Sequence, residues 1–164
     1  MIRKRFGIPL PNEYPKHVQA YEFTFTTDVD DLQDLITRMS KTLRSKMLNA
    51  VHYYIGFELT EQKLPHAHVM ILSNSKKIEY SKLRAIYNPV KKGSLHTDKV
   101  KNKEAFKTYI QKQHTDPEII NYFHQKNVPL YISTNKIEDA VFQKVSPADR
   151  DWETAPNNGN GIMF

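Results

Sequence analysis

At 164 residues the chain is long enough for one domain with a single buried core, and its 39% hydrophobic content argues against general disorder. The absence of cysteine excludes disulfides, a thiolate nucleophile and cysteine-based zinc sites, and it fits an intracellular protein. A net charge of +6 suits a polyanionic partner. No apolar run approaches the roughly 20 residues that span a bilayer, so no membrane association is expected.

The chain begins with a segment that has no regular pattern. Residues 1–18, with three prolines and scattered charges, predict a flexible basic arm. Residues 19–27 then alternate between aromatic and polar side chains, which predicts a strand with Tyr21, Phe23 and Phe25 on one face.

A long helix and two strands are expected next. Apolar residues recur at helical spacing after Asp28, the expected N-cap, and predict an amphipathic helix to about Leu48. Strands follow at 51–59 and 65–72. Because the connection between them is short, they should be antiparallel neighbours.

Four further elements follow in the second half of the chain: a helix at 78–87, a strand at 94–101, and helices at 103–114 and 117–125. The order of the elements predicts an α+β fold of the split βαβ type (ferredoxin-like or RRM-like), in which helices pack on a central antiparallel sheet. The domain is expected to cover residues 19–134. Residues 135–164 turn acidic and end in Asn and Gly, which predicts a poorly ordered C-terminal tail.

A pair of histidines opens the strand at 65–72. His66 and His68 are separated by one residue, so on a strand they project from the same face. Two imidazoles held side by side make half of a metal site. Glu58, on the neighbouring strand, could add a carboxylate, and Glu61 in the connecting turn is the competing candidate. Two histidines and a carboxylate leave positions on a divalent ion open for water or phosphate oxygens.

The helix at 103–114 carries a candidate nucleophile. Tyr109 and Lys112 are three residues apart and share a helix face. A phenol is a poor nucleophile at neutral pH unless a cation stabilises the phenolate, and Lys112 or a metal could do so. The alternative is that Tyr109 packs in the core.

The basic residues concentrate in one segment. Residues 76–114 contain eleven Lys or Arg against three acids, a balance of +8 that exceeds the charge of the whole chain. Such an excess favours a nucleic-acid surface, although a solvated lysine-rich face would look the same. The lysines expected to contact DNA are Lys91, Lys92, Lys99, Lys101 and Lys107.

Taken in order, these motifs resemble those of the HUH endonuclease superfamily, and within it the nuclease domain of replication initiator (Rep) proteins of circular single-stranded DNA viruses and rolling-circle plasmids. The resemblance covers about residues 19–114 and rests on four motifs: Tyr21–Thr27, Gly56–Glu58, Pro65–Val69 and Tyr109–Lys112.

The resemblance implies an enzyme that nicks and joins single-stranded DNA at an origin hairpin and so initiates rolling-circle replication. Glu58, His66 and His68 would hold Mn²⁺ or Mg²⁺. Tyr109 would attack the scissile phosphate, leaving a 3′-hydroxyl and a 5′-phosphotyrosine link, and Lys112 would position phosphate or assist the tyrosine.

One departure from the viral Rep proteins concerns the helicase domain that follows the nuclease in many of them. No such domain follows here, so the chain would be an excised nuclease domain or would work with a separate helicase. Its location would be the host nucleus for a eukaryotic virus and the cytoplasm for a bacterial source. Two alternatives stay open: a single-tyrosine transposase or relaxase-like nickase, and a non-catalytic RNA- or single-stranded-DNA-binding module on the same fold.

Overall fold

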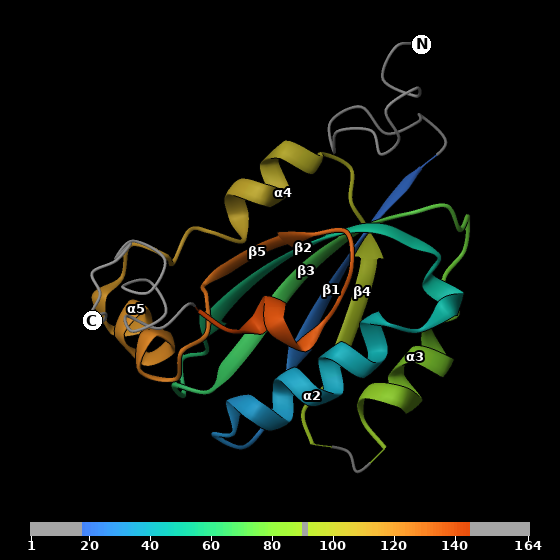
Figure 1. Cartoon of the computed structure of the whole chain (residues 1–164). Coiled ribbons are helices and arrows are strands. Elements are labelled where there is room, and N and C mark those ends of the chain that lie inside the picture. Colours follow the sequence, from blue (N-terminus) through green and yellow to red (C-terminus); the bar gives the residue numbers. More distant parts are fainter. Residues whose placement is uncertain (1–17, 90–91, 145–164) are drawn as a thin grey trace, which may run out of the picture.

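A five-stranded antiparallel sheet with helices on both faces organises the protein in a computed structural model that describes residues 18–89 and 92–144 (Figure 1). In chain order the elements are β1 (Gln19–Thr26), α2 (Leu32–Leu43), a 3₁₀ turn (Lys46–Leu48), β2 (Ala50–Leu59), β3 (Pro65–Ser73), α3 (Tyr80–Tyr87), β4 (Leu95–Lys99), α4 (Lys103–Tyr109), α5 (Pro117–Gln125), β5 (Tyr131–Thr134) and a second 3₁₀ turn (Asp139–Phe142).

The strand order confirms the predicted fold class. The sheet runs β4-β1-β3-β2-β5, and every neighbouring pair is antiparallel. The strands β1 and β2, which α2 connects, lie on either side of β3, and this is the split βαβ arrangement. The edge strand β5 was not predicted, because a strand of four residues is too short to show a clear alternation.

The main core lies between the sheet and the helices α2 and α3. Alternation along β1 points Tyr21, Phe23 and Phe25 to this face, as predicted, and β2 and β3 contribute the odd-numbered residues of their central parts. The helix α5 adds Phe123, whose ring centroid lies 5.4 Å from that of Phe57 on β2.

A buried arginine joins the two helices of the main core. Arg38 of α2 donates from its Nε to Asp34 at 3.0 Å and from Nη1 to the carbonyl of Tyr87, the last residue of α3, at 3.1 Å. Its guanidinium also lies 4.4 Å from the centre of the Tyr87 ring. Its Nη2 donates to Oγ1 of Thr27 at 3.4 Å, so each guanidinium nitrogen has an acceptor and the buried charge is paired with Asp34.

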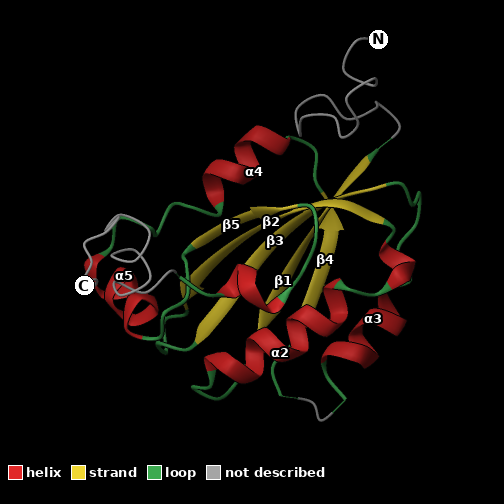
Figure 2. Cartoon of the chain, in the orientation of Figure 1, coloured by secondary structure: helices red, strands yellow, loops and turns green. Residues whose placement is uncertain are grey.

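The helix α4 covers part of the opposite face of the sheet (Figure 2). Phe106 of α4 and Ile110, the C-cap residue that follows the helix, pack on the even-numbered side chains of the strands, among them Ala20, Tyr54 and Met70. The sheet therefore has a large core on one face and a smaller cluster under α4 on the other. His66 and His68 have the same parity as Met70 and lie on the α4 side.

The helix ends differ from the predicted ones. The N-cap of α2 is Asp31, whose side chain accepts a hydrogen bond from the backbone of Asp34 at 3.0 Å, rather than Asp28. This helix ends at Leu43, since the chain turns there and the later apolar residues belong to the 3₁₀ turn Lys46–Leu48. The helix α3 begins at Tyr80 rather than 78, and α4 ends at Tyr109 rather than His114.

The predicted C-terminal boundary is wrong for ten residues. Ile137 and Phe142 are buried in the main core, and the Phe142 ring centroid lies 6.4 Å from that of Phe57. Residues 135–144 therefore belong to the domain. Residues 1–17 of the predicted arm and residues 145–164 of the predicted tail lie outside the described residues. In the part of the chain that is described, no helix combines the length and the apolar character needed to cross a membrane.

Candidate metal centre and tyrosine

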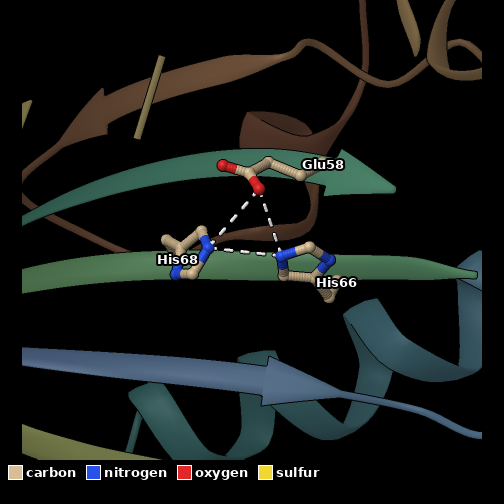
Figure 3. Close-up of side chains that lie close together, drawn as sticks. All are labelled: Glu58, His66 and His68. Carbon is tan, nitrogen blue, oxygen red and sulfur yellow. Dashed lines mark hydrogen bonds and ion pairs between the residues drawn. The ribbon is translucent and has the colours of Figure 1, made fainter. Parts of the chain in front are cut away.

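The pairing of β2 with β3 brings three candidate ligands together. Glu58 lies directly opposite His66 in the register, and His68 lies opposite Gly56. Because side chains two residues apart share a face, Glu58, His66 and His68 project from the α4 side of the sheet and point toward one another (Figure 3). Glu61, the competing carboxylate, is exposed in the turn and is not part of this cluster.

The distances in the cluster match those expected around a single ion. Oε1 of Glu58 lies 3.2 Å from Nε2 of His66 and 3.5 Å from Nε2 of His68, and the two nitrogens are 3.2 Å apart. Ligand atoms about 2.0 to 2.2 Å from a metal lie about 2.8 to 3.6 Å apart for octahedral or tetrahedral angles. The three atoms therefore form a triangle that one divalent ion can cap.

The charge state of Glu58 also favours a cation. Burial by itself would raise the pKa of Glu58, but hydrogen bonds and charge from His66 and His68 outweigh it and lower the pKa to about 2. Glu58 is only 3% exposed, and its Oε2 has no hydrogen-bond partner among the described residues. A buried carboxylate next to two ring nitrogens is stable only with a positive charge among them, which protons or a metal ion can supply.

Thr24 supports the cluster from β1, a role that the sequence did not reveal. It lies opposite His68 in the β1–β3 register, and its Oγ1 is 3.2 Å from Nδ1 of His68. When Nε2 of His68 faces an ion, Nδ1 carries the proton and donates it to this hydroxyl, which fixes the tautomer and the ring orientation.

Replacing Thr24 by valine should weaken Mn²⁺ binding about 10-fold, because an outer-shell partner of a histidine ligand is lost without a change in side-chain shape. Calorimetric titration with Mn²⁺ measures this directly. Thr37→Val is a matched control, because Thr37 is exposed on α2 at the other face. Equal affinity in Thr24→Val and the wild-type protein would show that the threonine contributes nothing to the site.

Tyr109 lies beside the cluster and is not a core residue. Its side chain is 42% exposed, so the alternative of core packing is wrong. The Tyr109 ring centroid is 5.2 Å from that of His68, and the planes meet at 62°. The Nζ of Lys112 lies 4.5 Å from the centre of the tyrosine ring, because the chain continues in a turn after α4 ends. The predicted pairing of Tyr109 with Lys112 therefore exists without a continuous helix.

Of the five lysines predicted to contact DNA, two that the structure describes, Lys99 and Lys107, lie on opposite faces of the sheet. Lys99 lies opposite Tyr21 in the β1–β4 register, which assigns it to the face of the main core rather than that of the histidines. Lys107 is on α4, but its Nζ forms an ion pair with Glu104 at 3.0 Å. Lys92 and Lys101 are exposed, and Lys91 is outside the described residues.

Comparison of the sequence with protein-family models and with curated proteins finds no match.

Proposed function

We propose that this protein is a metal-dependent endonuclease and strand transferase that nicks and rejoins single-stranded DNA through a tyrosine. The observation that carries the proposal is the convergence of Glu58, His66 and His68, with ligand atoms 3.2 to 3.5 Å apart, next to the exposed ring of Tyr109. A cation held by these three residues would attract a phosphate group to the side of the sheet on which Tyr109 lies.

The donor set narrows the choice of ion. Glu58, His66 and His68 would hold the ion, which supplies Lewis-acid polarisation of the scissile phosphate. Of the two ions expected, Mn²⁺ suits a site with two imidazole nitrogens better than Mg²⁺, which prefers ligands that are all oxygen.

The tyrosine performs the transfer. Its Oη would form a bond to phosphorus and give its proton to water, while the bond from phosphorus to the 3′-oxygen breaks. That oxygen would take a proton from water and leave as a 3′-hydroxyl, so the net transfer of the proton balances. The product is a 5′-phosphotyrosine link, and attack by a 3′-hydroxyl on this link reverses the reaction and joins two ends. The ammonium of Lys112, which lies 4.5 Å from the centre of the Tyr109 ring, would stabilise the developing phenolate or hold a phosphate oxygen.

The biological role that we attach to this chemistry is initiation of rolling-circle replication at an origin hairpin. It is supported by the order of the four motifs, which resembles that of Rep nuclease domains. Unwinding of the duplex would then come from a helicase outside the described domain. A single-tyrosine transposase or a relaxase-like nickase would use the same reaction on a different DNA.

A non-catalytic nucleic-acid-binding module is the competing function, because its fold would be the same. Glu58 argues against it. A carboxylate on the face that binds nucleic acid repels phosphate unless a cation neutralises it, and a simple binding surface gains nothing from that arrangement.

Denaturing gels distinguish the two functions. Protein mixed with hairpin oligonucleotides and Mn²⁺ should give a protein–DNA species that survives denaturation and is removed by protease, together with a shorter strand. Excess EDTA should prevent both products, because the ligands then hold no ion. Binding that is unaffected by EDTA, with no covalent species on any oligonucleotide of a randomised hairpin pool, would favour the non-catalytic module.

A further inference from the structure

The end of α4 rests directly on the backbone of β2 at a glycine. A Cβ atom added to Gly56 would lie 2.3 Å from the carbonyl oxygen of Ile110 and 3.0 Å from its Cβ. Ile110 is fully buried and follows Tyr109 in the chain. The helix therefore approaches the strand more closely than any other residue type at position 56 allows.

Two further contacts hold the chain after α4 to the same strand. Nε2 of His114 lies 3.0 Å from the carbonyl oxygen of Phe57, to which it donates, and the backbone N–H of Leu59 donates to Oε1 of Gln113 at 3.3 Å. Phe57 and Leu59 are the two neighbours of Glu58. The segment that follows Tyr109 is thus attached on both sides of a proposed metal ligand.

The register shows why these contacts matter for the tyrosine. Gly56 is the β2 residue opposite His68, and it lies two residues before Glu58 on the same face. Because Ile110 packs on Gly56, Tyr109 lies over the neighbouring strand β3. There the centroid of its ring is 5.2 Å from that of His68.

We infer that Gly56 is a positioning residue that sets the distance between Tyr109 and the metal centre, with Gln113 and His114 holding the chain in place. The effect on catalysis rests on the proposed function, whereas the positioning of Tyr109 rests only on the contacts described above. To relieve the contact at 2.3 Å and reach an ordinary separation of about 3.5 Å, a side chain at position 56 must lift the end of α4 by about 1 Å.

Gly56→Ala should therefore slow the single-turnover rate of adduct formation about 10²-fold, the usual effect of a misplacement of this size. The dissociation constant for Mn²⁺ should be unchanged, because the pairing of β2 with β3 does not involve α4. Leu83→Ala is the matched control, since Leu83 is fully buried in the main core on α3. It should lower the melting temperature without slowing adduct formation at a temperature where both variants are folded.

A second measurement follows the tyrosine without any reaction. With 3-fluorotyrosine at position 109, the ¹⁹F shift difference between Co²⁺-loaded and Zn²⁺-loaded protein reports how close the ring is to the ion. This difference should be smaller in Gly56→Ala than in the wild-type background. His114→Ala should reduce it as well, whereas His114→Gln, which keeps an N–H donor, should restore part of it.

Each outcome decides the inference. The same rate and the same ¹⁹F shift difference in Gly56→Ala and wild type would overturn it. A reduced shift difference in a protein that forms no adduct with any DNA would support the positioning of Tyr109 and contradict the proposed function. No metal-induced shift in the wild-type background would contradict both.

Discussion

Tyr109→Phe is expected to abolish the covalent protein–DNA adduct completely while leaving the protein folded and able to bind Mn²⁺ and single-stranded DNA. The substitution removes only the phenol oxygen, which is the atom that would bond to phosphorus. The ring is 42% exposed and its contacts with His68 and Lys112 do not depend on the hydroxyl for packing, so the fold should change little.

Residues 103–114 contain no second tyrosine that could replace Tyr109 as the nucleophile, and the next tyrosine in the chain has another partner. Tyr122, on α5, donates its hydroxyl to Asp30 at 2.6 Å. Burial raises the pKa of Tyr122, and the bond to Asp30 raises it further, so its phenolate is disfavoured. Tyr122→Phe should therefore form the adduct like the wild-type protein.

Adduct formation is measured on denaturing gels, with metal and DNA affinities measured separately by titration. Any protease-sensitive adduct in Tyr109→Phe would place the nucleophile on another residue. The assignment of the Tyr109–Lys112 motif would then be wrong, although the metal centre would be unaffected.

The double variant His66→Ala, His68→Ala is expected to lose Mn²⁺ binding and cleavage together. It removes two of the three ligand atoms, so the loss of affinity should exceed the roughly 100-fold that loss of an outer-shell partner can cost. Cleavage should fall to the level seen in excess EDTA. Full activity in this variant would exclude the histidines as ligands.

The double variant should also have a lower free energy of unfolding, so a control must separate this loss of stability from the loss of metal binding. Without the imidazoles Glu58 remains a buried carboxylate with no partner, and its pKa, which the histidines lower to about 2, should rise. The histidine contacts stabilise the fold at pH values above the ordinary pKa of a glutamate, and this stabilisation disappears as the pH falls through about 2. Adding Glu58→Gln to the double variant removes the unpaired charge and should recover stability but not metal binding.

Much of the sheet could be predicted from the sequence because its patterns are local. Alternation in β1 identified its buried face, and the short connection after Glu58 correctly made β2 and β3 neighbours, which put Glu58 opposite His66. The alternation of side chains along a strand was then enough to predict that His66 and His68 share a face. Each of these inferences uses residues that are close together in the chain.

The features that could not be predicted depend on contacts between distant segments. Asp28 and Asp31 are both suitable caps, and only the packing of α2 on the sheet decides between them. The support of His68 by Thr24 joins residues 44 positions apart, and the contact of Gly56 with Ile110 joins two segments with no shared pattern. A glycine in a strand indicates a close approach but does not say what approaches.

The separation of the proposed metal ligands from the main core has a consequence for how the protein would acquire a metal ion. Glu58, His66 and His68 occupy one face of a sheet whose largest apolar cluster is on the other, so folding does not have to wait for an ion. Small zinc domains behave differently, because their metal replaces a core and its removal unfolds them. If the proposed site binds an ion, the apoprotein should be a folded species that can release one ion and take up another. A free ion at about 100 times its dissociation constant would then add about 2.7 kcal/mol to the free energy of unfolding. The abundance of free divalent metal would then determine how many molecules are active, while the number of folded molecules stays nearly constant.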